Sequence, residues 1–157
     1  MLTIILGLGN PSLGDDAIGW RVVDALEARL AEEVKSQVVI ERLSVGGISL
    51  MEHLAGFERA LLVDSIDIPG GKPGDLLRLT LDTLPGTHAN SIHDVSLKDA
   101  LALGQRLGIE LPDELIIYAV QIERKLEFSE ELSAEVANSI DPAVEAMLAE
   151  LQKWLIA

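Results

Sequence analysis

Short apolar runs alternate along the chain with longer segments in which apolar residues recur at helical spacing. Residues 2–6 form a short, largely apolar run that stops at a glycine, which is typical of a buried strand. From about residue 16 to about residue 34 the apolar side chains share one face, which predicts an amphipathic helix. The same criteria predict further strands over residues 37–43, 59–65, 75–80 and 114–121, and further helices over residues 49–55, 91–107, 129–138 and 142–155.

This alternation of strands and helices predicts the α/β class. We expect residues 1–157 to form a single three-layer α/β/α domain, in which helices cover both faces of a twisted, mostly parallel five-stranded sheet. Residues 75–80 follow a segment rich in proline and glycine and are predicted to form one antiparallel edge strand. Sites in such sheets lie beyond the carboxyl ends of the strands, so the chemistry is expected in the loops after strands one, three and four.

Two helix starts carry local signals. Ser91 and Asp94 have the types and spacing of a capping box, and Asp141 with Pro142 marks either the start of the last helix or a kink in it.

The composition narrows the choice of partner. The net charge is −14, from 26 acidic and 12 basic residues, and such a surface repels phosphate backbones, so nucleic acid is not an expected partner. The chain has no cysteine, so any metal site must use oxygen and nitrogen ligands. The amino terminus has no basic leader and no apolar run reaches membrane-spanning length, so we expect a cytoplasmic protein without a membrane partner.

Acids and a histidine follow several of the predicted strands. Asp15 and Asp16 come after the first strand, Asp64 ends the third, and His93 lies beyond the fourth. Two carboxylates and an imidazole are a ligand set for Zn, Ni, Mn or Co, and three protein ligands leave the coordination sphere open. Convergence of Asp16, Asp64 and His93 at one edge of the sheet therefore predicts a metal-contacting site.

Each of these residues also has an ordinary structural explanation. Asp15 is best explained as a helix cap or as a first-turn acid that interacts favourably with the helix dipole. His88 and Asp67 are second choices for the positions given to His93 and Asp64, and His53 is assigned to packing or solvent. Only the expected convergence favours a functional site.

The glycines near the amino terminus do not form a dinucleotide-binding loop. The stretch Gly7-Leu-Gly9-Asn10-Pro11-Ser-Leu-Gly14 lacks G-x-G-x-x-G spacing, and two aspartates stand where a pyrophosphate needs positive potential. We expect these glycines to permit a sharp turn and a close approach of the backbone.

A longer pattern in the same region resembles the opening motif of the hydrogenase maturation proteases. It reads Gly7-x-Gly9-Asn10-x-x-x-x-Asp15-Asp16-x-x-Gly19. The resemblance extends over most of the chain, through Gly46-Gly47, Val63-Asp64-Ser65, Pro73-Gly74, Ser91-x-His93 and the Pro142-containing final helix. Ser44-Val45-Gly46-Gly47 stands where many members have an Asp-Gly-Gly-Thr-like stretch.

The resemblance implies a nickel-dependent endopeptidase. Such an enzyme removes the C-terminal extension of a [NiFe] hydrogenase large-subunit precursor after nickel insertion, so nickel is carried by the substrate. The family's three metal-contacting positions fall on Asp16, Asp64 and His93, and an aspartic-type mechanism assigns catalysis to Asp16 and Asp64.

Two alternatives remain at this point. Peptidyl-tRNA hydrolases also open with a strand followed by Gly-Leu-Gly-Asn-Pro, but they need a basic surface for tRNA, which a net charge of −14 does not provide. A non-catalytic nickel chaperone for hydrogenase assembly has the same expected site without peptide cleavage.

Overall fold

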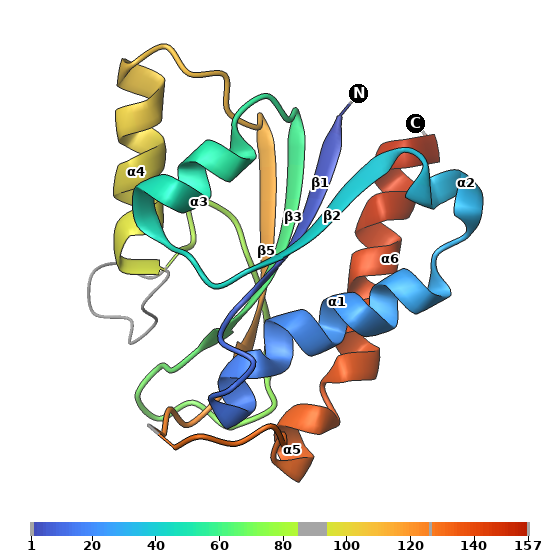
Figure 1. The fold of residues 1–157 in the computed structure, drawn as a ribbon, viewed down its shortest axis with the longest axis vertical. Helices are drawn as coiled ribbons and strands as arrows, with labels where there is room; N and C mark the ends of the chain where they lie inside the picture. Colours follow the sequence, from blue (N-terminus) through green and yellow to red (C-terminus); the bar gives the residue numbers. More distant parts are fainter. Residues whose placement is uncertain (1, 85–93, 126, 157) are drawn as a thin grey trace.

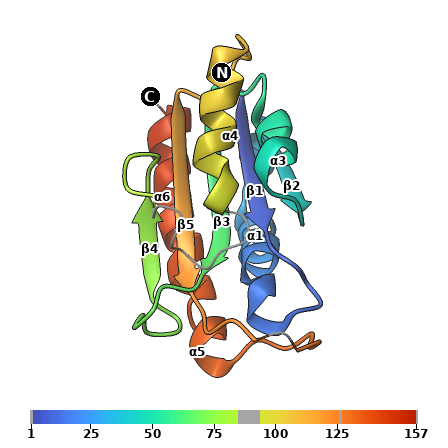
Figure 2. The same ribbon diagram turned by 90° about the vertical axis from the view of Figure 1, so that its left-hand side faces the viewer.

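A five-stranded sheet forms the centre of the molecule in the computed structural model, which describes residues 2–84, 94–125 and 127–156 (Figure 1). Its strand order is β2-β1-β3-β5-β4, visible across Figure 2. The strands are β1 (Thr3–Leu8), β2 (Val38–Leu43), β3 (Arg59–Ile66), β4 (Leu76–Leu79) and β5 (Glu114–Gln121). All neighbours are parallel except β4 and β5, so the predicted antiparallel edge strand is confirmed.

Helices cover both faces of the sheet, as the sequence predicted. The helices α1 (Ile18–Arg29) and α6 (Ile140–Ile156) lie on one face, and α3 (Gly47–Leu54) and α4 (Asp94–Arg106) lie on the other (Figure 1). Side chains of β3 alternate between the two cores, because successive strand residues point to opposite faces. Leu61 and Val63 pack with α1 and α6, whereas Ala60 and Leu62 pack with α3 and α4.

The first predicted helix is shorter than its pattern suggested. It ends at Arg29, and the short helix α2 (Glu32–Lys35) follows two extended residues. Leu30 is one of them: its side chain is buried in the core, and its backbone turns the chain toward β2. Burial of one leucine therefore interrupts a run that otherwise has helical spacing.

The prediction of a helix over residues 129–138 is mostly wrong. Only α5 (Ala134–Ala137) is helical. Ser129 instead lies beside the loop after β1, where its amide donates to the Ser12 carbonyl and its carbonyl accepts from the Gly14 amide. Long-range pairing of the backbone thus replaces local helix formation in this segment. The predicted capping residue Ser91 lies outside the described residues.

The last helix begins earlier than predicted. It starts at Ile140, so that Asp141 and Pro142 lie in its first turn, where proline needs no amide partner.

A polar network ties β4, β5 and α6 together. The Tyr118 hydroxyl donates to Glu150 Oε1 at 3.0 Å, and Arg78 Nε lies 2.5 Å from the same oxygen. Burial, and then the hydrogen bond to Glu150, raise the pKa of Tyr118 to about 12. Burial raises the pKa of Glu150, but the bonds from Arg78 and Tyr118 outweigh it, so the net pKa is lowered.

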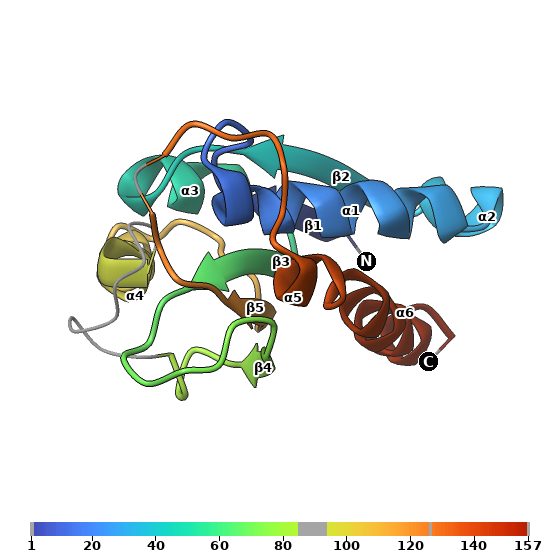
Figure 3. The ribbon, with the colours of Figure 1, turned by 90° about the horizontal axis from the view of Figure 1, so that it is seen from below.

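The carboxyl ends of β1, β3 and β5 meet at one edge of the sheet, which faces the viewer in Figure 3. The strand β4 runs the other way, so its carboxyl end lies away from this edge. In the described part of the chain, no helix combines the length and the apolar character needed to span a membrane.

Candidate functional site

The loop between β1 and α1 delivers an aspartate to the carboxyl edge, and glycines allow it to do so. Gly9 has φ of 144°, and a Cβ there would lie 2.1 Å from the Asp16 carbonyl oxygen. A Cβ on Gly19 would lie 2.2 Å from the Leu8 carbonyl oxygen, so the start of α1 packs directly on the strand. The glycines serve a close backbone approach, as expected from the sequence.

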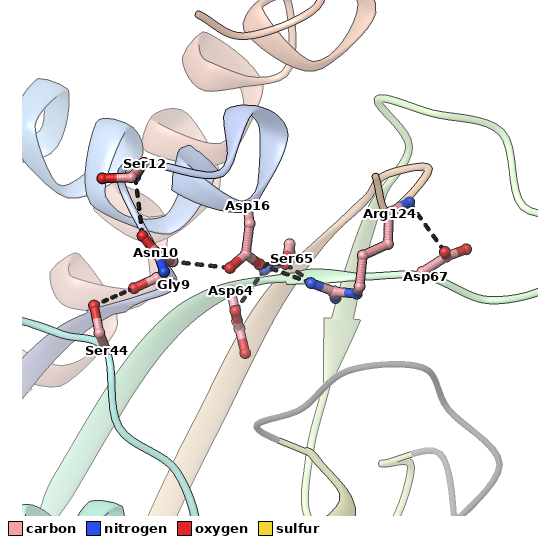
Figure 4. A network of polar contacts seen from close by, with 9 residues as sticks. All are labelled: Gly9, Asn10, Ser12, Asp16, Ser44, Asp64, Ser65, Asp67 and Arg124. Carbon is pink, nitrogen blue, oxygen red and sulfur yellow. Dashed lines mark hydrogen bonds and ion pairs between the residues drawn. The ribbon is translucent and has the colours of Figure 1, made fainter. Parts of the chain in front are cut away.

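Asp16 is buried and receives three hydrogen bonds. It is 2% exposed. Its Oδ2 accepts from the Asn10 amide at 3.0 Å, and its Oδ1 accepts from Ser65 Oγ at 2.6 Å and Arg124 Nη1 at 3.0 Å (Figure 4). The donors come from the loop after β1, from β3 and from the loop after β5. Asp16 therefore links three segments that are distant in sequence.

Asp64 and Ser65 lie near the carboxyl end of β3, with their side chains on opposite faces of the sheet. The alternation seen at residues 60–63 places Asp64 on the side of α3 and α4, and Ser65 on the side of α1 and α6. Asp64 is 2% exposed, and its Oδ1 accepts from the Ser65 amide at 2.7 Å. The two predicted aspartates thus flank the end of β3, with Asp64 pointing away from Ser65 in Figure 4.

Arg124 brings a positive charge to this acidic edge. It follows β5, and its guanidinium also lies near Ser65 Oγ, with Nη2 at 3.5 Å. Its amide donates to Asp67 Oδ2 at 3.1 Å (Figure 4). Asp67, a second choice for the site in the sequence, therefore fixes the backbone of Arg124. The Arg124 side chain is 19% exposed and that of Asp16 is 3% exposed, so their ion pair is largely shielded from water.

The segment after β5 folds over the edge and is tied to the β1 loop. Ser133 donates its amide and its hydroxyl to the two carboxyl oxygens of Asp15, at 2.7 and 2.8 Å. Asp15 does not cap a helix: its side chain binds a residue 118 positions away. It does lie in the first turn of the short 3-10 helix Gly14–Ala17, which was the other explanation predicted for it. Figure 3 shows the segment between β5 and α5 crossing beside the start of α1.

A cavity of about 220 Å³ opens between these two loops. Asp16 and Arg124 line it together with Leu13, Ile122, Lys125 and Ser129, among others. The buried ion pair therefore borders a space that can admit part of another molecule.

The histidines of the prediction contribute no described contact at this edge. His93 and His88 lie outside the described residues. His53 lies on α3, where its Nδ1 is 3.3 Å from Glu41 Oε2. Among the residues that the structure describes, no three His, Cys, Asp or Glu side chains form a cluster able to hold a metal ion. Of the three predicted metal ligands, Asp16 and Asp64 lie within the described residues.

Arg124 does not figure in the sequence-based prediction, and Ser65 figures there only within the family stretch Val63-Asp64-Ser65, without a role. Their positions along the chain could have indicated their roles. Ser65 follows Asp64 on the third strand, and Arg124 lies three residues after the end of the fifth strand. The expected loops were those after strands one, three and four, and the loop after strand five was omitted. All parallel strands end at the same edge, so that loop belonged to the site as well.

Known proteins that are similar to this chain are hydrogenase maturation proteases. The family model for hydrogenase maturation proteases matches residues 20–150. The "Hydrogenase 2 maturation protease" of Escherichia coli is 32% identical over 155 residues, which is 98% of this chain and 92% of that protein. A "Putative hydrogenase maturation protease" of Methanocaldococcus jannaschii is also 32% identical, and the match covers 96% of both chains.

Solved structures resemble the chain in the same way. The hydrogenase maturating endopeptidase HybD from E. coli has a TM-score of 0.81 at 31% identity, covering 98% of this chain and 93% of its own. The [NiFe] hydrogenase maturation protease HybD from Thermococcus kodakarensis has a TM-score of 0.67 at 25% identity, covering 96% and 99%.

Proposed function

The chain belongs to the hydrogenase maturation proteases, and from that premise we propose that it is a nickel-dependent endopeptidase acting on a [NiFe] hydrogenase large-subunit precursor. The reaction is removal of the precursor's C-terminal extension after nickel has been inserted, with residues 1–157 acting as one protease domain. Nickel belongs to the substrate in this scheme, and the protein recognises it in place.

The observation that carries the proposal is a buried aspartate that borders a cavity at the carboxyl edge of the sheet. Asp16 is 2% exposed and borders a cavity, and its Oδ1 lies 3.0 Å from a guanidinium nitrogen. A carboxylate has about four acceptor positions, and Asp16 uses three of them for hydrogen bonds. One acceptor position of the carboxylate therefore remains for a further ligand, and nickel accepts a mixed set of oxygen and nitrogen donors.

Three residues are proposed to contact the nickel of the precursor. Asp16 and Asp64 supply oxygen donors from the two sides of β3, and His93 supplies a nitrogen donor. Their contacts fix the scissile peptide against a water molecule, which lowers the entropic part of the barrier. Asp16 or Asp64 takes the proton of the attacking water as general base.

The test is intact-mass analysis of a large-subunit precursor incubated with this protein in nickel-loaded and nickel-free forms. We expect a C-terminal peptide to be lost from the loaded form alone. Cleavage of both forms would refute nickel dependence. Nickel binding without cleavage of either form would favour the chaperone alternative.

Aspartate variants assign the site within the same assay. Asp16→Asn and Asp64→Asn should each abolish cleavage while the circular dichroism spectrum is retained. Asp24→Asn is the matched control, because Asp24 lies on α1 with its side chain 58% exposed and pairs with Arg42. Wild-type cleavage by either site variant would remove that residue from the mechanism.

A further inference from the structure

The Asp16 carboxylate already has a cation beside it, and the proposed function gives that cation no role. Arg124 Nη1 lies 3.0 Å from Asp16 Oδ1, and Nη2 lies 3.5 Å from the Ser65 hydroxyl (Figure 4). The backbone of Arg124 is held in turn by Asp67 at 3.1 Å. These contacts therefore hold the guanidinium inside the site.

A metal ion that binds Asp16 must compete with this contact. Oδ1 accepts from both Ser65 and Arg124, so a metal has to displace a donor or share the remaining acceptor position of the carboxyl group. The bond between a guanidinium and a carboxylate is also stronger than one between neutral groups.

We propose that Arg124 is a specificity-determining residue that keeps Asp16 from binding free divalent ions. In the protein without precursor the Arg124 guanidinium pairs with the Asp16 carboxylate, and free divalent ions bind weakly because they must compete with it. A metal already held by the precursor arrives with the binding energy of the whole protein–protein contact and displaces Arg124. The inference rests on the proposed function, because it takes Asp16 as a contact to the precursor's metal.

The neighbouring Lys125 provides a matched control. It lines the same cavity and carries the same charge, and the three hydrogen bonds to the Asp16 carboxyl group come from Asn10, Ser65 and Arg124 instead. Loss of charge at Lys125 reports the general electrostatic effect of removing one cation near the cavity. Any larger effect at Arg124 then exceeds what the loss of one positive charge near the cavity explains.

The experiment measures Ni²⁺ binding to the free protein by equilibrium dialysis, without precursor. We expect Arg124→Gln to bind Ni²⁺ more tightly than wild type by on the order of tenfold, the change that loss of one charge-assisted hydrogen bond brings to an equilibrium. Lys125→Gln should stay within about threefold, a free-energy difference of less than 1 kcal/mol.

Two results overturn the proposal: unchanged Ni²⁺ affinity in Arg124→Gln, or an equal gain in both variants. If Arg124→Gln does not retain the wild-type circular dichroism spectrum, Arg124→Met replaces it, since its unbranched side chain keeps the apolar stem, and the same outcomes decide. The precursor assay distinguishes failure of this inference from failure of the proposed function. If wild type cuts the loaded precursor while Arg124→Gln gains no affinity, this inference fails and the proposed function stands.

Discussion

Replacing Asp16 by asparagine tests the network on which the site depends. The carboxyl group accepts from the Asn10 amide on Oδ2, and from Ser65 and Arg124 on Oδ1. An asparagine side chain offers one acceptor oxygen and one NH₂ group. If the oxygen faces Ser65 and Arg124, the NH₂ group opposes the Asn10 amide; in the reverse orientation the NH₂ group opposes Arg124, while the Ser65 hydroxyl can turn to accept from it. At least one buried donor therefore loses its partner.

The cost follows from these contacts. An unmet buried donor costs about 1–3 kcal/mol, and the bond from Arg124 loses the charge that made it roughly twice as strong as a neutral one. Together we expect Asp16→Asn to lower the free energy of unfolding by roughly 2–4 kcal/mol. Most domains have about 5–15 kcal/mol in total, so the variant should remain folded at 25 °C.

Urea unfolding followed by circular dichroism measures this loss, and intact-mass analysis measures cleavage by the same preparation. The double variant with Arg124→Gln should lose less than the sum of the two single losses, with a coupling of about 0.5–3 kcal/mol, as for residues in contact. Asp24→Asn, whose side chain is 58% exposed, should cost less than about 1 kcal/mol. A loss at Asp16 no larger than at Asp24, or additive losses in the double variant, would refute the network as described.

Three further predictions concern the scaffold around the site. Gly19→Ala places a Cβ 2.2 Å from a strand carbonyl oxygen, so it should destabilise the protein by about 1–3 kcal/mol in urea unfolding, as overpacking does. Tyr118, the only tyrosine, should show phenolate absorbance near pH 12. Its folded pKa exceeds the unfolded value of about 10, so it stabilises fully below pH 10, and that contribution is lost as the pH rises toward 12; absorbance near pH 10 in the folded protein would contradict its burial against Glu150. Asp15→Ala removes both bonds to Ser133 and should speed amide hydrogen exchange at Ser133, with no change at the centre of β3.

The sequence determined the class of the fold through local patterns. The apolar runs at β1, β3 and β5 and the amphipathic segments between them predicted a mostly parallel sheet covered on both faces. Hydrophobic period is a local property, so it can be read without knowing which segments meet. The same rule placed Asp16 and Asp64 at one edge, where the structure has them.

Only the tertiary structure decided how that edge is built. The pairing of Ser129 with the β1 loop overrode a helical pattern, and Asp15, for which a cap was one of two expectations, bonds to Ser133 from the first turn of its short helix. Arg124 reached Asp16 from 108 residues away. The spacing of apolar residues along the sequence cannot predict such contacts. Their free energy comes from desolvation and pairing between segments that meet only after the sheet has formed.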